Sequence, residues 1–245
     1  MSRFKRLRQR LRQFESGHYA RVAIALVVTS AGPASASSSL PHQVSRAGLC
    51  VTEGTIDELP ASHRLSVDSP KMRAFVNARP VQSIEARFAY LGATSHDVPL
   101  GSGTIRRQFG LKLRAQDACN LIYAMWRIEP ESKLVVSIKE NPGQHLSAEC
   151  GNRGYVNIKP QRSAPPPKLR PGEVHTLRAE MTPTTMNIYI DKTLAWQGPL
   201  SPDVLKWDER VGVRSDNVRV QFDLAAPIAE HSGSENCRAE PADAE

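Results

Sequence analysis

Short runs that alternate apolar and polar residues recur from residue 84 to residue 222, and this period of two constrains the fold most. In one run Ile84, Ala86 and Phe88 share a face, and in another Ile188 and Ile190 lie opposite Tyr189. Successive side chains of a strand point to opposite faces, so these runs indicate half-buried strands. With no long helical pattern and no repeat among them, the sequence predicts an all-β, antiparallel, two-sheet sandwich.

Other segments refine this prediction. Residues 119–130 are apolar on both faces, which is typical of a covered central strand and places Trp126 in the core. Residues 145–150 and 155–160 are predicted as strands. Residues 161–173 are rich in proline, which breaks regular structure, and indicate a long surface loop. Residues 201–207 are the one short helix expected, with Ser201 as its N-cap.

The first 36 residues combine seven cations and one acid with a short apolar run and the exit Ala34-Ser35-Ala36. A basic start, an apolar middle and a small-x-small exit describe a secretory signal peptide, and the apolar run is too short to span a bilayer. We therefore expect a secreted or periplasmic protein with no transmembrane segment in the mature chain. A disordered basic tail or an organelle transit peptide are the alternatives.

Of the net charge of +7, +6 belongs to this leader. Residues 37–245 hold 25 cations and 24 acids, so the mature chain has no overall charge that would attract nucleic acid. The expected organisation is a signal peptide at 1–36, a linker or irregular edge at 37–60, a β-sandwich domain at 61–226 and a polar tail at 227–245.

Four cysteines remain in an exported chain, and none is spaced as a metal or redox motif. In an oxidising compartment an even number favours disulfides, and three pairings are possible. We favour Cys119 with Cys150, because each flanks a strand in one block, which leaves Cys50 with Cys237.

The order VHTLRAEMT, TMNIYID, KTLAWQG, RVGVRSD and NVRVQFDL resembles the closing strands of concanavalin A-like jelly rolls, the lectin/glucanase and laminin-G-like superfamily. The resemblance spans roughly residues 80–225. It implies a jelly-roll sandwich whose larger sheet presents a concave ligand face. Lectins, glycosidases, polysaccharide lyases and interaction modules share this fold, so the function must come from the residues.

Strand alternation places polar side chains of several runs on one face, provided that the strands are neighbours. The cations on it favour a carboxylated or sulfated ligand, and the tyrosines offer flat surfaces to sugar rings. The sequence therefore predicts an exported, non-catalytic module for acidic polysaccharide or cell-surface glycan. The residues expected to bind the ligand are Tyr123, Arg127, Lys139, His145, Glu149, Arg153 and Tyr155.

Two alternatives stay open. A polysaccharide lyase acting on a uronate polymer would use His145 or Tyr155 as base or acid, and Arg127 or Lys139 to neutralise the carboxylate. Its motifs are matched only in part, since Gln144 directly precedes His145 with no residue between them. The other alternative is a structural or protein-interaction module whose polar face only meets water.

Two further chemistries lack their residues. No strand carries the three acids of a glucanase of this fold, so paired-carboxylate hydrolysis is excluded. Asp191 and Asn187 supply too few oxygens for calcium, and Asp191 fits a hairpin turn. No metal site or cofactor is expected, although a structural calcium is not excluded.

Overall fold

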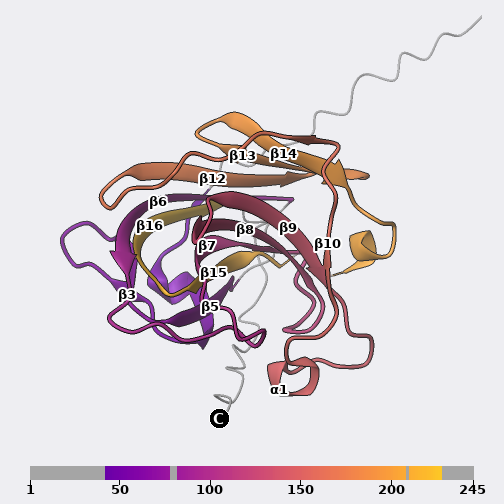
Figure 1. Ribbon diagram of the computed structural model, residues 1–245, viewed down its shortest axis with the longest axis horizontal. Helices are drawn as coiled ribbons and strands as arrows, with labels where there is room; N and C mark the ends of the chain where they lie inside the picture. The colour runs from indigo at the N-terminus through magenta and orange to yellow at the C-terminus, as the bar shows by residue number, and fades with distance from the viewer. Residues whose placement is uncertain (1–41, 78–81, 208–209, 228–245) are drawn as a thin grey trace, which may run out of the picture. The chain divides into compact units, whose positions relative to one another are not determined.

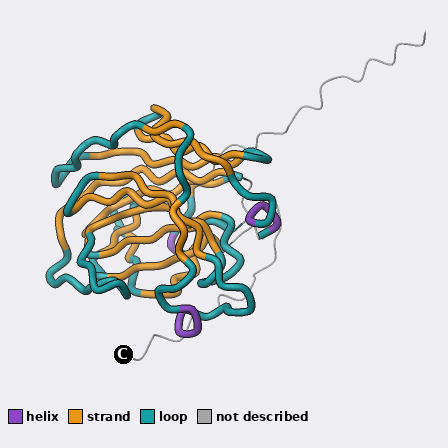
Figure 2. Tube along the Cα trace, turned by 45° about the vertical axis from the view of Figure 1, so that its right-hand side comes forward, coloured by secondary structure: helices purple, strands orange, loops and turns teal. Residues whose placement is uncertain are grey.

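The computed structural model describes residues 42–77, 82–207 and 210–227, and the following account concerns these residues. They form two antiparallel β-sheets, most of whose strands are labelled in Figure 1. Helix is confined to short turns, as Figure 2 shows. The predicted all-β, two-sheet sandwich is confirmed.

The seven-stranded sheet contains the central strand predicted from the doubly apolar run, with β10 and β2 at its edges. Its order is β10 (Tyr155–Asn157), β9 (Lys133–Lys139), β8 (Leu121–Glu129), β7 (Arg107–Leu113), β15 (Gly212–Asp216), β5 (Lys71–Val76) and β2 (Leu49–Glu53).

The second sheet has nine strands among the described residues, and very short strands β11 and β3 end it. Its order is β11 (Arg162–Ser163), β14 (Thr193–Pro199), β13 (Thr185–Ile190), β12 (Val174–Met181), β6 (Ser83–Ala93), β16 (Val218–Ala226), β4 (Leu65–Val67) and β3 (Asp57–Glu58), with β1 (His42–Gln43) paired to β16.

An aromatic cluster joins the two sheets. Phe88 of β6 lies 4.7 Å from Phe109 of β7 and 5.7 Å from Trp126 of β8, between ring centroids. Phe109 is 5.5 Å from Phe222 of β16. Each such side chain contributes about 1.5–3 kcal/mol by leaving water, so the alternating apolar positions hold the sheets together. The core position predicted for Trp126 is confirmed, since its exposed fraction is 0%.

The strand predicted at 145–150 is wrong, because residues Ser147–Cys150 form the single helical turn α1. The Glu149 carboxylate accepts hydrogen bonds from the backbone N–H groups of His145 (2.7 Å) and Leu146 (3.0 Å). These local bonds favour a turn over a ladder. The helix expected at 201–207 is one 3-10 turn, Val204–Lys206.

Part of the segment 37–60, expected as a linker or irregular edge, is regular structure. Residues 49–53 form β2, which pairs with β5 at the edge of the seven-stranded sheet. Its residues are half-buried, so this part of the segment is a sheet edge rather than a linker.

The predicted disulfide Cys119–Cys150 is present, with its Cα atoms 5.9 Å apart. Cys237 lies outside the described residues, as do the predicted signal peptide and nearly all of the polar tail, so the Cys50–Cys237 pairing stays a prediction. Among the residues described, no helix has the length and hydrophobicity needed to cross a membrane.

Candidate functional site

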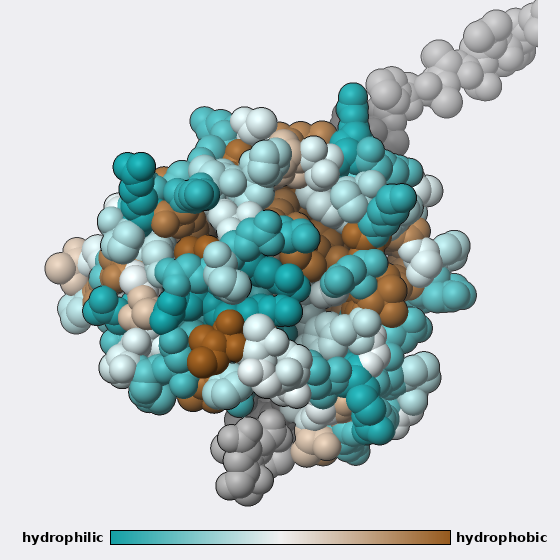
Figure 3. Space-filling view, viewed as in Figure 1, coloured by the Kyte–Doolittle hydropathy of each residue, from teal (hydrophilic) through white to brown (hydrophobic). Residues whose placement is uncertain are grey.

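A groove of about 660 Å³ lies on the face of the seven-stranded sheet that points away from the core. In β8, Tyr123, Met125 and Arg127 line this groove, whereas Ala124 and Trp126 of the same strand pack in the core between the sheets. Successive side chains of β8 therefore point alternately into the core and into the groove. Hydrophilic residues gather at the centre of the view in Figure 3, over β7, β8 and β15 as labelled in Figure 1.

Two loops line the groove together with the strands. Residues 98–102 come from the connection between β6 and β7, and residues 151–152 follow α1. The loops touch, since a Cβ atom added to Gly101 would lie 3.0 Å from Cβ of Asn152. They therefore form a continuous wall beside the sheet.

A buried charge network lies at the floor of the groove. The Asp216 carboxylate, with an exposed fraction of 0%, accepts hydrogen bonds from Arg73 (2.7 Å), Arg214 (2.9 Å) and Gln108 (2.6 Å). Burial favours the neutral acid, but the two guanidinium groups outweigh burial and hold the pKa of Asp216 well below its usual range. Arg73 and Arg214 thus have a resident counter-charge.

An aromatic end of the groove, made of Tyr123, Tyr155, Lys139 and Arg214, rests on this network. The rings of Tyr123 and Tyr155 stack with centroids 6.0 Å apart, and the Arg214 guanidinium lies 4.7 Å from the Tyr123 centroid. Arg214 also donates a hydrogen bond of 3.3 Å to the Tyr155 hydroxyl. Tyr155 remains 38% exposed, so its ring is available to a ligand.

Charges around the aromatic end move the pKa values of both tyrosines. Burial and the neighbouring Tyr155 raise the pKa of Tyr123. Burial opposes ionisation of Tyr155 as well, but the nearby Arg214 and Lys139 outweigh it and lower its pKa. Tyr155 is therefore the more acidic phenol of the stacked pair.

An arginine end of the groove is formed by Arg106 and Arg127. Arg127 lies opposite Gln108 on β7, and Arg106 directly precedes β7. Neither guanidinium has a hydrogen-bond or ion-pair partner among the residues described, and the Nε atom of Arg127 is buried. This end of the groove therefore carries two positive charges that have no ion-pair partner among the residues described.

The two ends are far apart along the sheet. Tyr155 lies opposite Lys139 of β9, whereas Arg127 lies opposite Lys133 at the other end of the same strand. Six strand residues at about 3.3 Å each separate these positions by roughly 20 Å. Arg127 and Tyr155 line one groove but cannot act on the same atom.

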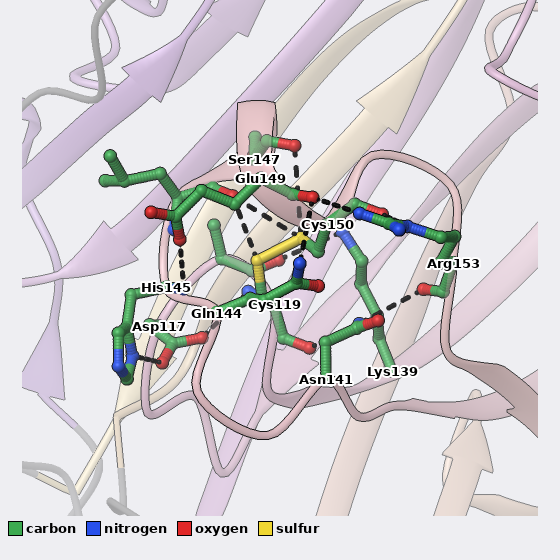
Figure 4. Close-up of a disulfide and its surroundings, with 12 residues drawn as sticks. Asp117, Cys119, Lys139, Asn141, Gln144, His145, Ser147, Glu149, Cys150 and Arg153 are labelled. Atoms are coloured by element: carbon green, nitrogen blue, oxygen red, sulfur yellow. Dashed lines mark hydrogen bonds and ion pairs between the residues drawn. A yellow bond between two sulfur atoms is a disulfide. The ribbon is translucent and has the colours of Figure 1, made fainter.

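Three of the predicted site residues serve the disulfide-bonded loop instead of the groove (Figure 4). The His145 Nδ1 atom lies 2.7 Å from the Asp117 carboxylate. Glu149 accepts the loop N–H bonds described above, and the Arg153 guanidinium donates to the carbonyls of Glu149 and Cys150. None of the three lines the groove. The structure therefore brings Tyr123, Arg127, Lys139 and Tyr155 into the groove and leaves the other three in its supporting loop.

Sequence reasoning missed the cations that β5 and β15 supply. In β5, Arg73 lies between buried Met72 and Ala74, and in β15, Arg214 lies between buried Val213 and Ser215. This alternation was the signal that could have assigned both arginines to the face opposite the core. Strand order was the missing information, because β15 and β5 reach β7 only through long connections.

Seven cations and one acid, Glu53, line the groove. The cations are Lys71, Arg73, Arg106, Lys112, Arg127, Lys139 and Arg214.

The two oxygens weighed as calcium ligands have other partners. Asp191 accepts a hydrogen bond from the backbone N–H of Thr176 (2.9 Å) and lies 2.7 Å from His175 Nδ1. Asn187 Oδ1 accepts a hydrogen bond of 2.9 Å from Gln197. Asp191 and Lys192 have positive φ angles of 48° and 68° and form the turn between β13 and β14, as predicted for Asp191.

No protein-family model matches this chain, and no curated protein matches it. Solved structures with some likeness include the carbohydrate-binding module CBM66 from Bacillus subtilis, 14% identical with a TM-score of 0.49 over 74% of this chain and 93% of that one. Domain 4 of AbnA, a GH43 extracellular arabinanase from Geobacillus stearothermophilus, in complex with arabinotriose, is 10% identical with a TM-score of 0.42, over 74% and 82%.

The metal-free carbohydrate recognition domain of Emp46p is 8% identical with a TM-score of 0.45, over 74% of this chain and 88% of that one. Likenesses of this size carry no argument about a ligand. The candidate site is therefore described from this structure alone. It is a polar groove on the outer face of one sheet of an antiparallel sandwich.

Proposed function

We propose that this protein is a non-catalytic module that binds an acidic glycan in the groove of the seven-stranded sheet. One observation carries the proposal: seven cations and a stacked tyrosine pair line the groove, against a single acid. Arginine engages a carboxylate or sulfate through paired hydrogen bonds, and aromatic rings pack on the apolar faces of sugars. Both groups lie in one groove long enough for several sugar units.

Export from the cytosol is part of the proposal and rests on the signal-peptide pattern of residues 1–36. The disulfide between Cys119 and Cys150 supports it, since such bonds persist in oxidising compartments. Secreted and periplasmic locations are both compatible with this reasoning.

A glycan array of carboxylated, sulfated and neutral polymers tests the binding directly. We expect the wild-type protein to bind acidic polymers and to lose affinity as salt is added, because salt screens exposed charges beyond about 8–10 Å. Replacing Tyr155 by alanine removes the exposed ring and should weaken binding about tenfold, the effect of roughly 1.4 kcal/mol.

Tyr189→Ala is the matched control, because this tyrosine lies on β13 of the other sheet and does not line the groove. It should bind like the wild type. If the wild-type protein binds no acidic polymer, or if both tyrosine variants behave alike, the groove is only a solvated surface and the proposal fails.

A uronate lyase is the second candidate, and the lowered pKa of Tyr155 beside Lys139 favours it. The Tyr155 phenolate could remove the proton beside the carboxylate while Lys139 offsets the carboxylate charge. As the double bond forms and the glycosidic bond breaks, the phenol could return that proton to the leaving oxygen. His145 does not line the groove and Arg127 lies at its other end, so Tyr155 and Lys139 alone would form the centre. Incubation with alginate, pectate or glucuronan should then produce an ultraviolet-absorbing unsaturated product, which Tyr155→Phe would abolish. Absence of product over this panel rejects the lyase.

A further inference from the structure

We infer that Arg106 and Arg127 form the anion subsite of the groove and receive one carboxylate or sulfate group of the ligand. This inference rests on the proposed function and adds which end of the groove binds the negatively charged group of the ligand. The aromatic end would then take a sugar ring, and the anionic group would lie roughly 20 Å away, six strand residues along β9 at about 3.3 Å each.

The pairing of the neighbouring arginines distinguishes this subsite. Arg107, next in sequence to Arg106, forms ion pairs with Asp97 (2.6 Å) and with Glu129. Arg73 and Arg214 share Asp216. Among these arginines, Arg106 and Arg127 have no hydrogen-bond or ion-pair partner for their side chains among the described residues, and both line the groove.

The surroundings of Arg127 leave its guanidinium group without a direct partner among the described residues. Its buried Nε atom has no hydrogen-bond acceptor, and a buried donor without a partner costs about 1–3 kcal/mol. Burial first, and then the like charge of Arg106, lowers the pKa of Arg127, whereas Glu131 acts in the opposite direction. Glu131 forms no ion pair with it among the described residues. An oxyanion placed between the two guanidinium groups would accept hydrogen bonds from their terminal NH2 groups and relieve the repulsion between the two charges.

The planar guanidinium fork suits this role because it presents parallel N–H groups to the two oxygens of a carboxylate or sulfate. Two forks at one end and two stacked rings at the other define a ligand of several units. Short acidic oligosaccharides should reach one end only. Affinity should therefore rise steeply at the chain length that first spans both ends.

Sulfate titration followed by NMR tests the subsite without any glycan. Inorganic sulfate should shift the Nε–Hε signals of Arg106 and Arg127 in a saturable way. The corresponding signal of Arg162, an exposed arginine on β11 of the other sheet, should not move. If sulfate shifts all three signals alike, or neither of the groove signals, the subsite is wrong.

Glycan binding by matched variants provides the second test. Arg106→Gln and Arg127→Gln should each weaken binding of oligouronates and of heparin-type oligosaccharides about tenfold and should flatten the salt dependence. Arg162→Gln removes the same charge outside the groove and should leave binding unchanged. Glu131→Gln removes the opposing charge and should tighten binding. Arg127→Lys keeps the charge without the fork, so it should recover only part of the affinity.

The outcomes separate this inference from the proposed function. If Tyr155→Ala weakens glycan binding while the double arginine variant binds like the wild type, the groove binds glycan and the subsite is wrong. If sulfate titrates both arginines but no acidic glycan binds, the subsite stands and the proposed function fails. Thermal unfolding and circular dichroism of each variant establish that a loss of binding does not arise from misfolding.

Discussion

Asp216 balances the charge beneath the groove, because its fully buried carboxylate contacts both Arg73 and Arg214. Replacing it by asparagine keeps the shape but leaves two buried guanidinium groups uncompensated. We expect Asp216→Asn to lower the free energy of unfolding by roughly 3–5 kcal/mol, measured by urea denaturation. Asp203→Asn, which removes an exposed partner of Lys206, should change it little.

The same carboxylate predicts a pH dependence of stability. Its pKa is lowered in the folded state, so its contribution is fully present above the unfolded value of about 3.9 and disappears as the pH falls toward the folded value. The wild-type protein should therefore lose stability below about pH 4, and Asp216→Asn should lose less. If both proteins lost the same stability as the pH fell, Asp216 would not be the charged partner of Arg73 and Arg214.

His145 offers a second test at the level of one side chain. The hydrogen bond to Asp117 is the main cause that raises the pKa of His145, and the negative charge of Asp117 raises it further. A raised pKa means that the interaction stabilises the folded state below about pH 6.5 and that this contribution is lost as the pH rises through the folded value. NMR titration should give a value above about 6.5 for the wild type, and Asp117→Asn should return it toward that reference.

The disulfide-bonded loop is the element whose removal should affect the groove most. Cys119 and Cys150 are 31 residues apart, and closing a loop of this length contributes roughly 3–4 kcal/mol in the chain-entropy model. The variant with both cysteines replaced by serine should unfold at correspondingly lower denaturant concentration. Because Asn152 lies in this loop and touches Gly101, glycan affinity should fall too. A variant that loses neither would show that the loop is held by its hydrogen bonds alone.

Alternation in the sequence predicted the elements better than it predicted their neighbours. It assigned Tyr123 and Arg127 to one face of β8 and placed Trp126 on the other, because side-chain direction in a strand is a local property. It could not place Arg214 beside Tyr123, since that contact depends on β15 lying next to β7. Alternation also predicted a strand where the helical turn α1 forms. The hydrogen bonds that the Glu149 carboxylate accepts from the backbone favour this turn, and they leave no periodic pattern in the sequence.

The whole molecule is expected to leave the cytosol before it functions. Mature protein recovered from the periplasm or medium of a bacterial host should begin near Ser37, as N-terminal sequencing can determine. Peptide mapping without reductant should recover Cys119–Cys150 and, by the same prediction, Cys50–Cys237. Intact protein with Met1 and free thiols in the cytosol would contradict the expected compartment.

The ends of both sheets bear on how copies of the molecule meet. β10 has three residues, β11 and β3 have two each, and Pro160 follows closely after β10. The remaining edge strand, β2, has five residues, and its register is interrupted between Val51 and Glu53. Unpaired strand edges recruit other chains when they are long and flat, whereas short edges beside proline give an incoming strand few N–H and C=O groups to pair with. Concentrated solutions should therefore resist fibril growth through these edges.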